Sequence, residues 1–101
     1  FGLSSEPKGN VAEAIKLIRK YDKKVLAVDT PTGIDGLTGK SFNNYIKADY
    51  TVALGIPLKG TINNKKCGKI YVSDIGIPDR VYSAVKLEVK PRFHKKSIIK
   101  L

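Results

Sequence analysis

In the stretch VLAVD, residues 25–29, four apolar residues are followed directly by an aspartate. The apolar residues do not alternate with polar ones, and such a run is typical of a strand buried on both faces of a parallel sheet. A strand of this kind needs other strands beside it and helices over its faces. The sequence therefore predicts an α/β fold with a mostly parallel sheet.

A helix is predicted directly before this strand. Asn10 is suited to cap it, and Glu13 stands three residues further on, as in a capping box. Apolar residues then recur at the spacing of one helix face, namely Val11, Ala14, Ile15 and Ile18. A helix followed at once by a buried strand is half of a βαβ unit, so we expect this helix to pack against the sheet.

Three more stretches are predicted to be strands. Residues 50–54 and 70–72 repeat the apolar run, whereas residues 85–89 alternate apolar and polar positions, as an edge strand does. The polar, glycine-punctuated residues 58–69 favour a loop over a full helix. Pro91 is expected to end the last strand.

The composition is that of a small domain with one core. Of the 101 residues, 42% are hydrophobic, and the single Cys67 excludes an internal disulfide, which favours a reducing compartment. No apolar run approaches the roughly 20 residues of a membrane span, and no signal-peptide pattern opens the chain. We therefore predict a soluble, cytoplasmic protein. The lack of methionine and the start at Phe1 suggest that the chain is a fragment.

The net charge of +10 raises the possibility of nucleic-acid binding, because clustered lysines release counterions from a phosphate backbone. Its distribution argues against that function. Residues 86–101 hold six basic residues and one acidic residue, so half of the excess lies in this tail. The rest of the chain is only mildly basic, as a solvated surface is. Nucleic-acid binding is therefore not the expected function.

Asp29 is the first candidate for chemistry. Ligands of open α/β sheets bind beyond the carboxyl ends of the strands, and Asp29 comes directly after such an end. Pro31 and Gly33 favour a tight turn that stays close to the strand. The alternative is that the Asp29 side chain caps this turn. Asp35 and Asp74 lie in turn-like sequences and are predicted to be turn formers.

The first nine residues, FGLSSEPKG, give a weaker signal. They are rich in glycine and serine and lead into the predicted helix, where backbone amides and hydroxyls can hold an anionic group. Many ordinary loops before helices have the same composition. The stretch alone does not define a phosphate site.

Three motifs resemble those of the YjeF N-terminal domain family, the NAD(P)H-hydrate epimerases. VDTPTGIDGLTGK is similar to the family pattern VDIPSGLDxxTG, and KADYTVALGIPLKG is similar to ADxTVTLGxPKxG. GKIYVSDIGIPDRVY is similar to the closing segment with DIGIP. The motifs stand in family order and cover about residues 1–82. Residues 1–90 are therefore expected to be the C-terminal part of such a domain, with residues 91–101 as a basic tail or linker.

The opening FGLSSEPKGNVAEAI resembles the end of the family's DxLxGTGL loop and the helix after it, with Phe1 in place of the usual threonine. The family's GPGNNGGD loop and the acidic residue before GTGL are not in this sequence. The resemblance implies that the loop residues contact the substrate. These are Phe1, Gly2, Leu3, Ser4, Ser5 and Glu6.

The resemblance implies a Rossmann-like three-layer α/β/α sandwich that interconverts the R and S epimers of hydrated NADH and NADPH for cofactor repair. It implies that Asp29 contacts the substrate, and we expect Asp29 to be the catalytic acid and base. Thr32 takes the place of the family serine that ligates a potassium ion. A hydroxyl oxygen is kept at that position, and oxygen is the ligand that a hard cation prefers.

The resemblance also bears on partners. It implies a homodimer and a dehydratase that uses the S epimer, on the same or on a separate chain. PRFHKKSIIKL, residues 91–101, is similar to the junction before a fused dehydratase domain, or is an ordinary basic tail in which His94 has no role. The alternative function is that of a non-catalytic YjeF-type domain that acts in dimerisation or RNA binding. Asp29 and the Thr32 hydroxyl favour the epimerase.

Overall fold

The computed structural model of the chain describes residues 5–85 and 91–101. The elements run in the order α1 (Gly9–Tyr21), β1 (Leu26–Val28), β2 (Tyr50–Leu54), a 3₁₀ turn (Lys59–Thr61), β3 (Lys69–Ser73), α2 (Asp79–Ala84) and β4 (Ile98–Lys100). The strands form one sheet in the order β1-β2-β3-β4. The first three strands are parallel, and β4 is antiparallel to β3. The predicted α/β class with a mostly parallel sheet is confirmed.

One face of this sheet carries the core. Its side chains are small or branched and buried: Ala27 on β1, Thr51 and Ala53 on β2, and Ile70 and Val72 on β3. The long connections between the strands cover this face, and they contribute Ile34 and Cys67, which cluster with Ile70. The core therefore lies between the sheet and its own loops.

The opposite face of β1 is not buried. Leu26 and Val28 are 61% and 63% exposed, so the prediction of a strand buried on both faces is wrong for the described part of the chain. The continuous apolar run predicted the parallel sheet correctly. The side chains that point away from the core have no covering layer among the described residues.

Helix α1 starts earlier than the sequence suggested. Its N-cap is Lys8, whose carbonyl accepts the first helical hydrogen bond from the Ala12 amide. Asn10 therefore lies inside the first turn and cannot cap the helix, so that prediction was wrong. The buried residues of the helix are Ala12 and Ile15, whereas Ala14 and Ile18 are exposed.

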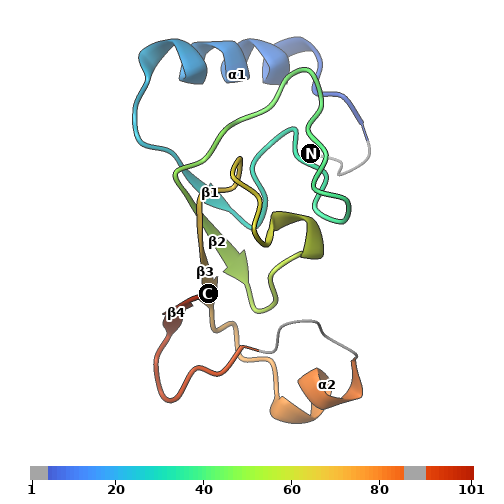
Figure 1. Cartoon of the computed structure of the whole chain (residues 1–101), viewed down its shortest axis with the longest axis vertical. Coiled ribbons are helices and arrows are strands. Elements are labelled where there is room, and N and C mark those ends of the chain that lie inside the picture. The colour runs from blue at the N-terminus through green and yellow to red at the C-terminus, as the bar shows by residue number, and fades with distance from the viewer. Residues whose placement is uncertain (1–4, 86–90) are drawn as a thin grey trace.

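The helix also packs differently from the expectation. Figure 1 shows α1 at one end of the molecule, over the green segment that leads into β2, and α2 at the other end. The Arg19 guanidinium lies 5.3 Å from the centre of the Tyr45 ring in that segment. The helix therefore contacts the β1–β2 connection, and the expectation that it lies on the sheet was wrong.

The C-terminal residues form part of the sheet. The amide of Leu101 donates to the Ile70 carbonyl at 2.9 Å, and the Asp74 amide donates to the Ser97 carbonyl at 2.8 Å. Within the segment predicted to be a basic tail or linker, residues 91–101, β4 supplies the edge strand of the sheet. The division into a domain over residues 1–90 and a tail stays a prediction. The strand predicted at residues 85–89 falls mainly on residues 86–90, which lie outside the described residues.

The connection over residues 58–69 is built of turns and one short 3₁₀ turn, as predicted. No helix in the described part of the chain is long and apolar enough to cross a membrane.

Candidate functional site

Asp29 stands at the carboxyl end of β1, as predicted. Its amide continues the sheet by donating to the Val52 carbonyl at 2.7 Å, and the Thr30 amide turns back to the Val28 carbonyl at 2.8 Å. The φ angle of Asp29 is +67°, in the left-handed region that residues other than glycine seldom adopt. Such strain is often kept at functional sites, where the backbone is held to aim one side chain.

The Asp29 carboxylate differs from those of the other two loop aspartates. The Asp35 carboxylate accepts the Leu37 and Thr38 amides at 2.8 and 3.1 Å, and that of Asp74 accepts the Gly76 amide at 2.9 Å. Both are turn formers, as predicted. Within residues 5–85 and 91–101, no hydrogen bond or ion pair engages the Asp29 carboxylate. The alternative that Asp29 merely caps its turn is therefore not supported.

The turn after Asp29 is clamped by the segment that follows it. The Ile46 amide donates to the Thr32 carbonyl at 2.8 Å, and the Phe42 amide donates to the Gly33 carbonyl at 2.9 Å. Gly33 has a φ of +83°, and a Cβ there would overlap the Asn44 carbonyl oxygen. The backbone position of Thr32 is therefore fixed by hydrogen bonds from the later part of the same loop to Thr32 and Gly33.

Glu6 joins the N-terminal segment to the same loop. Its carboxylate accepts the amides of Asn43 and Asn44 at 3.0 and 2.9 Å, and also the Asn44 side-chain amide at 2.9 Å. Glu6 therefore acts as a clamp in this structure, while its predicted substrate contact stays a prediction. Ser5 is exposed. The other predicted loop residues, Phe1, Gly2, Leu3 and Ser4, lie outside the described residues.

The turn can offer oxygen atoms to an alkali cation. Thr30 Oγ1 is buried and has no hydrogen-bond partner among the described residues, and Thr32 follows two positions later. Groups of three or more histidine, cysteine, aspartate or glutamate side chains suited to a transition metal do not occur in the described part. Hydroxyl and carbonyl oxygens suit a hard cation, so the residues present fit potassium better than zinc or iron.

Asp49 has a structural role that was not predicted from the sequence. Its carboxylate accepts the Val25 amide at 2.8 Å and lies 3.5 Å from the Lys24 ammonium group. The hydrogen bond from Val25, and to a lesser extent the charge of Lys24, lowers the pKa of the Asp49 carboxyl. Asp49 thus ties the starts of β1 and β2 together. The one sequence feature that could have indicated this role is the position of Asp49 directly before an apolar strand.

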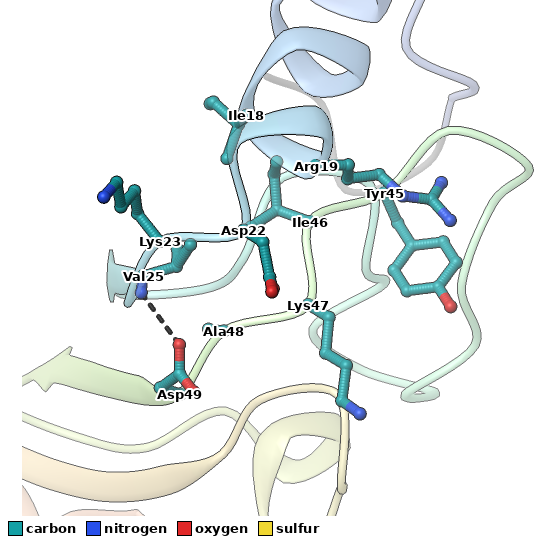
Figure 2. Close-up of a pocket in the computed structure, with 10 residues that line it drawn as sticks. All are labelled: Ile18, Arg19, Asp22, Lys23, Val25, Tyr45, Ile46, Lys47, Ala48 and Asp49. Carbon is teal, nitrogen blue, oxygen red and sulfur yellow. Dashed lines mark hydrogen bonds between the residues drawn. The ribbon is translucent and has the colours of Figure 1, made fainter.

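A hollow of about 340 Å³ lies at the amino ends of β1 and β2, whereas Asp29 follows the carboxyl end of β1. Figure 2 shows the Val25 amide directed at Asp49, and the Arg19 and Tyr45 side chains beside each other. Its other lining residues are Ile18, Asp22, Lys23, Ile46, Lys47 and Ala48. The hollow contains neither Asp29 nor Thr32, so it is not the predicted site.

The fold and the site define an α/β protein with a mostly parallel sheet and a strained aspartate at the carboxyl end of β1. Residues 1–60 match the family described as "YjeF-related protein N-terminus". The chain belongs to this family.

The relatives that the chain resembles are longer proteins. It is 34% identical to the NAD(P)H-hydrate epimerase of Elusimicrobium minutum over 85 residues, which are 83% of this chain and 38% of that protein. It is 38% identical to the NAD(P)H-hydrate epimerase of Levilactobacillus brevis over 88 residues, 82% of this chain and 41% of that protein. Its identity to the bifunctional NAD(P)H-hydrate repair enzyme Nnr of Moorella thermoacetica is 32%, over 79% of this chain and 16% of that enzyme.

The fold also matches a solved structure. The crystal structure of the yeast protein ynu0 superposes with a TM-score of 0.78 at 23% identity, over all of this chain and 44% of that one. This likeness supports the fold alone. The chain thus spans about two fifths of the length of the first epimerases it matches and less than half of the yeast protein.

Proposed function

We propose that this chain supplies part of the active site of an NAD(P)H-hydrate epimerase, which interconverts the R and S forms of hydrated NADH and NADPH. The relatives named as epimerases support the reaction. The observation that carries the proposal is the Asp29 carboxylate, which has no partner among the described residues and stands on a strained backbone. Such a carboxylate is free to exchange protons with a substrate.

The chemistry needs one group that can act as acid and then as base. In the hydrate, C6 of the nicotinamide ring carries the hydroxyl and is bonded to the ring nitrogen. A protonated Asp29 carboxyl gives its proton to the hydroxyl, the C6–O bond breaks, and water leaves as the nitrogen lone pair forms a C=N bond. Water then adds to the other face of C6 and returns a proton to the Asp29 carboxylate.

Electrostatics help this step. The intermediate carries a positive charge on the ring, and an ionised carboxylate held close to it lowers its energy. Because the backbone at Asp29 is fixed by its bond to the Val52 carbonyl, little reorganisation is needed when that charge appears. The proton returns to the group that gave it, so the cycle needs no further reagent.

We propose potassium as the bound ion, with the Thr32 hydroxyl as a ligand and the buried Thr30 hydroxyl as a further oxygen donor at the same turn. When bound, the ion supplies a fixed positive charge that orients oxygen atoms of the substrate. Thr32→Val keeps the shape of the side chain and removes the oxygen. We expect this variant to lose the dependence of the rate on potassium, measured against sodium at equal ionic strength.

The proposal extends to the partner reaction. Some relatives are named as bifunctional repair enzymes, which supports a dehydratase as the consumer of the S form, on the same polypeptide or on another. The homodimer that the family resemblance implies stays a prediction.

The experiment follows the oxygen atom. The protein is incubated with the R form of hydrated NADH in ¹⁸O-labelled water. The S form is then separated by chromatography, and its mass is measured by mass spectrometry. We expect the S form to appear faster than in a protein-free control and to carry one ¹⁸O atom. Faster appearance without the label would refute the proposed water exchange, and no acceleration would refute the epimerase function.

A further inference from the structure

Glu6 uses both of its carboxylate oxygens to hold the later part of the β1–β2 connection. Oε2 accepts the Asn43 amide at 3.0 Å, and Oε1 accepts the backbone and side-chain amides of Asn44, each at 2.9 Å. A carboxylate offers about four acceptor positions, so three of them are already taken here. Little capacity is left for a further ligand, and the bonds are of the strong, charge-assisted kind.

The segment that Glu6 holds lies directly against the turn of residues 30–33. The Asn44 carbonyl oxygen comes so close to Gly33 that no Cβ fits between them. Two residues after Asn44, the Ile46 amide donates to the Thr32 carbonyl at 2.8 Å. A shift of the Asn44 backbone is therefore passed on to Thr32.

Glu6 is the main tether of this segment. Within residues 5–85 and 91–101, the backbone amides of Asn43 and Asn44 have no other acceptor. The neighbouring Tyr45 ring lies 5.3 Å from the Arg19 guanidinium and 5.0 Å from the Lys66 ammonium group. Contacts of this kind at exposed sites are weaker than hydrogen bonds to a carboxylate. They do not replace Glu6 when it is lost.

A cation site depends on such a tether. The groups around a metal ligand orient it, and their loss weakens metal binding even though they do not touch the ion. Thr30 Oγ1 is buried without a partner among the described residues, and Thr32 stands in the same turn. The oxygens of this turn bind a cation well only while the turn keeps its shape.

We propose that Glu6 is a positioning residue of the potassium site, because its carboxylate holds residues 43–46 against the turn and so keeps the Thr32 oxygens in place. This inference rests on the proposed function, since it takes residues 30–33 as the cation site. Glu6 acts through Asn44 and Thr32 and touches neither the ion nor the substrate. The role differs from the substrate contact that the family resemblance implies.

The test compares the potassium requirement of the wild-type protein with that of Glu6→Ala, Glu6→Gln and two controls. Glu13→Ala removes an exposed carboxylate that pairs with Lys16 at 3.3 Å, so it matches the loss of charge. Thr51→Val removes the buried bond to the Cys67 carbonyl, so it matches a general loss of stability. The melting temperature is measured without substrate while potassium replaces sodium at constant ionic strength. The rate of epimerisation is measured over the same series.

We expect Glu6→Ala to raise at least tenfold the potassium concentration that gives half of the maximal thermal shift. Excess potassium should restore its rate, with the KM for hydrated NADH unchanged. Glu6→Gln keeps an acceptor oxygen for Asn44, so it should remain folded even where Glu6→Ala does not, with a rise of about threefold. Both controls should have the wild-type potassium requirement, because a merely structural loss lowers the melting temperature equally in both salts.

A wild-type potassium requirement in both Glu6 variants would overturn the inference. A raised KM that excess potassium does not correct would also overturn it, because Glu6 would then contact the substrate. A wild-type protein without a potassium-dependent thermal shift would overturn the potassium site together with the inference. A wild-type protein with that shift but without epimerisation would refute the reaction alone, and the thermal series would still decide the role of Glu6.

Discussion

Three aspartates in the loops of this chain differ in what their carboxylates contact. Asp35 and Asp74 each use a carboxylate oxygen to accept a nearby amide, whereas that of Asp29 accepts none among the described residues. The sequence predicted that Asp29 ends a strand, but it could not separate a capping aspartate from a reactive one. That difference depends on a φ angle of +67° and on which amides lie within reach.

Two threonines with buried hydroxyl groups give a matched prediction. Thr30 Oγ1 has no partner among the described residues, whereas Thr51 Oγ1 donates to the Cys67 carbonyl at 2.6 Å. In potassium-free buffer, Thr30→Val should raise the free energy of unfolding by about 1 kcal/mol, because an unsatisfied hydroxyl is removed. Thr51→Val should lower it by about 1–2 kcal/mol, because a buried hydrogen bond is lost. Urea denaturation measures both, and equal effects would contradict this assignment.

The single thiol should be nearly inert in the folded chain. Burial raises the pKa of Cys67 from its usual 9.0 to about 11. Because the thiolate is the reactive form, only about one molecule in a thousand is reactive at pH 8. Labelling with iodoacetamide at pH 8 should be at least a hundredfold slower than in urea. Rapid labelling without urea would show that Cys67 is accessible.

At the scale of elements, the strands were easier to predict than the contacts between them. The apolar runs predicted β1, β2 and β3 because parallel strands need continuous hydrophobic side chains. The position of α1 was not predictable, because Arg19 and Tyr45 are brought together by a connection that has no periodic pattern. The clamp from Glu6 to Asn44 joins residues 38 positions apart, a pairing that spacing along the chain does not reveal.

The turn that holds Thr32 should be sensitive to one added methyl group. A Cβ at Gly33 would overlap backbone atoms of Asn44 and Tyr45, whereas a Cβ at Gly76 would meet no atom within 4 Å. Both glycines have positive φ angles, so both alanine variants bear the left-handed strain of about 1 kcal/mol. Gly33→Ala should cost about 2–3 kcal/mol more than Gly76→Ala. Thermal unfolding measures the difference, and equal losses would contradict the close packing of this turn.

The hydrogen bond from the Val25 amide to the Asp49 carboxylate should make the stability of the fold depend on pH. Since the folded pKa of Asp49 lies below the usual 3.8, its contribution is complete above about pH 4 and is lost as the pH falls through the folded pKa. Asp49→Asn should therefore have a lower melting temperature than the wild type at pH 7, and the gap should narrow below pH 4. A gap of the same size at pH 3 and pH 7 would show that the charge is not involved.

Over the described residues as a whole, one face of the sheet is covered by the core and the other face has no covering layer. The apolar composition and the strand pattern predicted a core, and the connections between the strands provide it. The sequence could not predict which face would lack a covering layer, because Leu26 and Val28 are as apolar as buried strand residues are. The strand β4 could not be predicted from the sequence either. Its segment is short and basic, and it is recognised as a strand only by its pairing with β3.

The rate of epimerisation with and without the Asp29 carboxylate shows whether Asp29 is the acid and base. The protein that carries this chain is compared with its Asp29→Asn and Asp35→Asn variants, using the R form of hydrated NADH and chromatographic separation of the epimers. If Asp29 is the acid and base, its loss should lower kcat at least a hundredfold, with Asp35→Asn close to the wild type. An Asp29→Asn variant as fast as the wild type would show that Asp29 is not the acid and base.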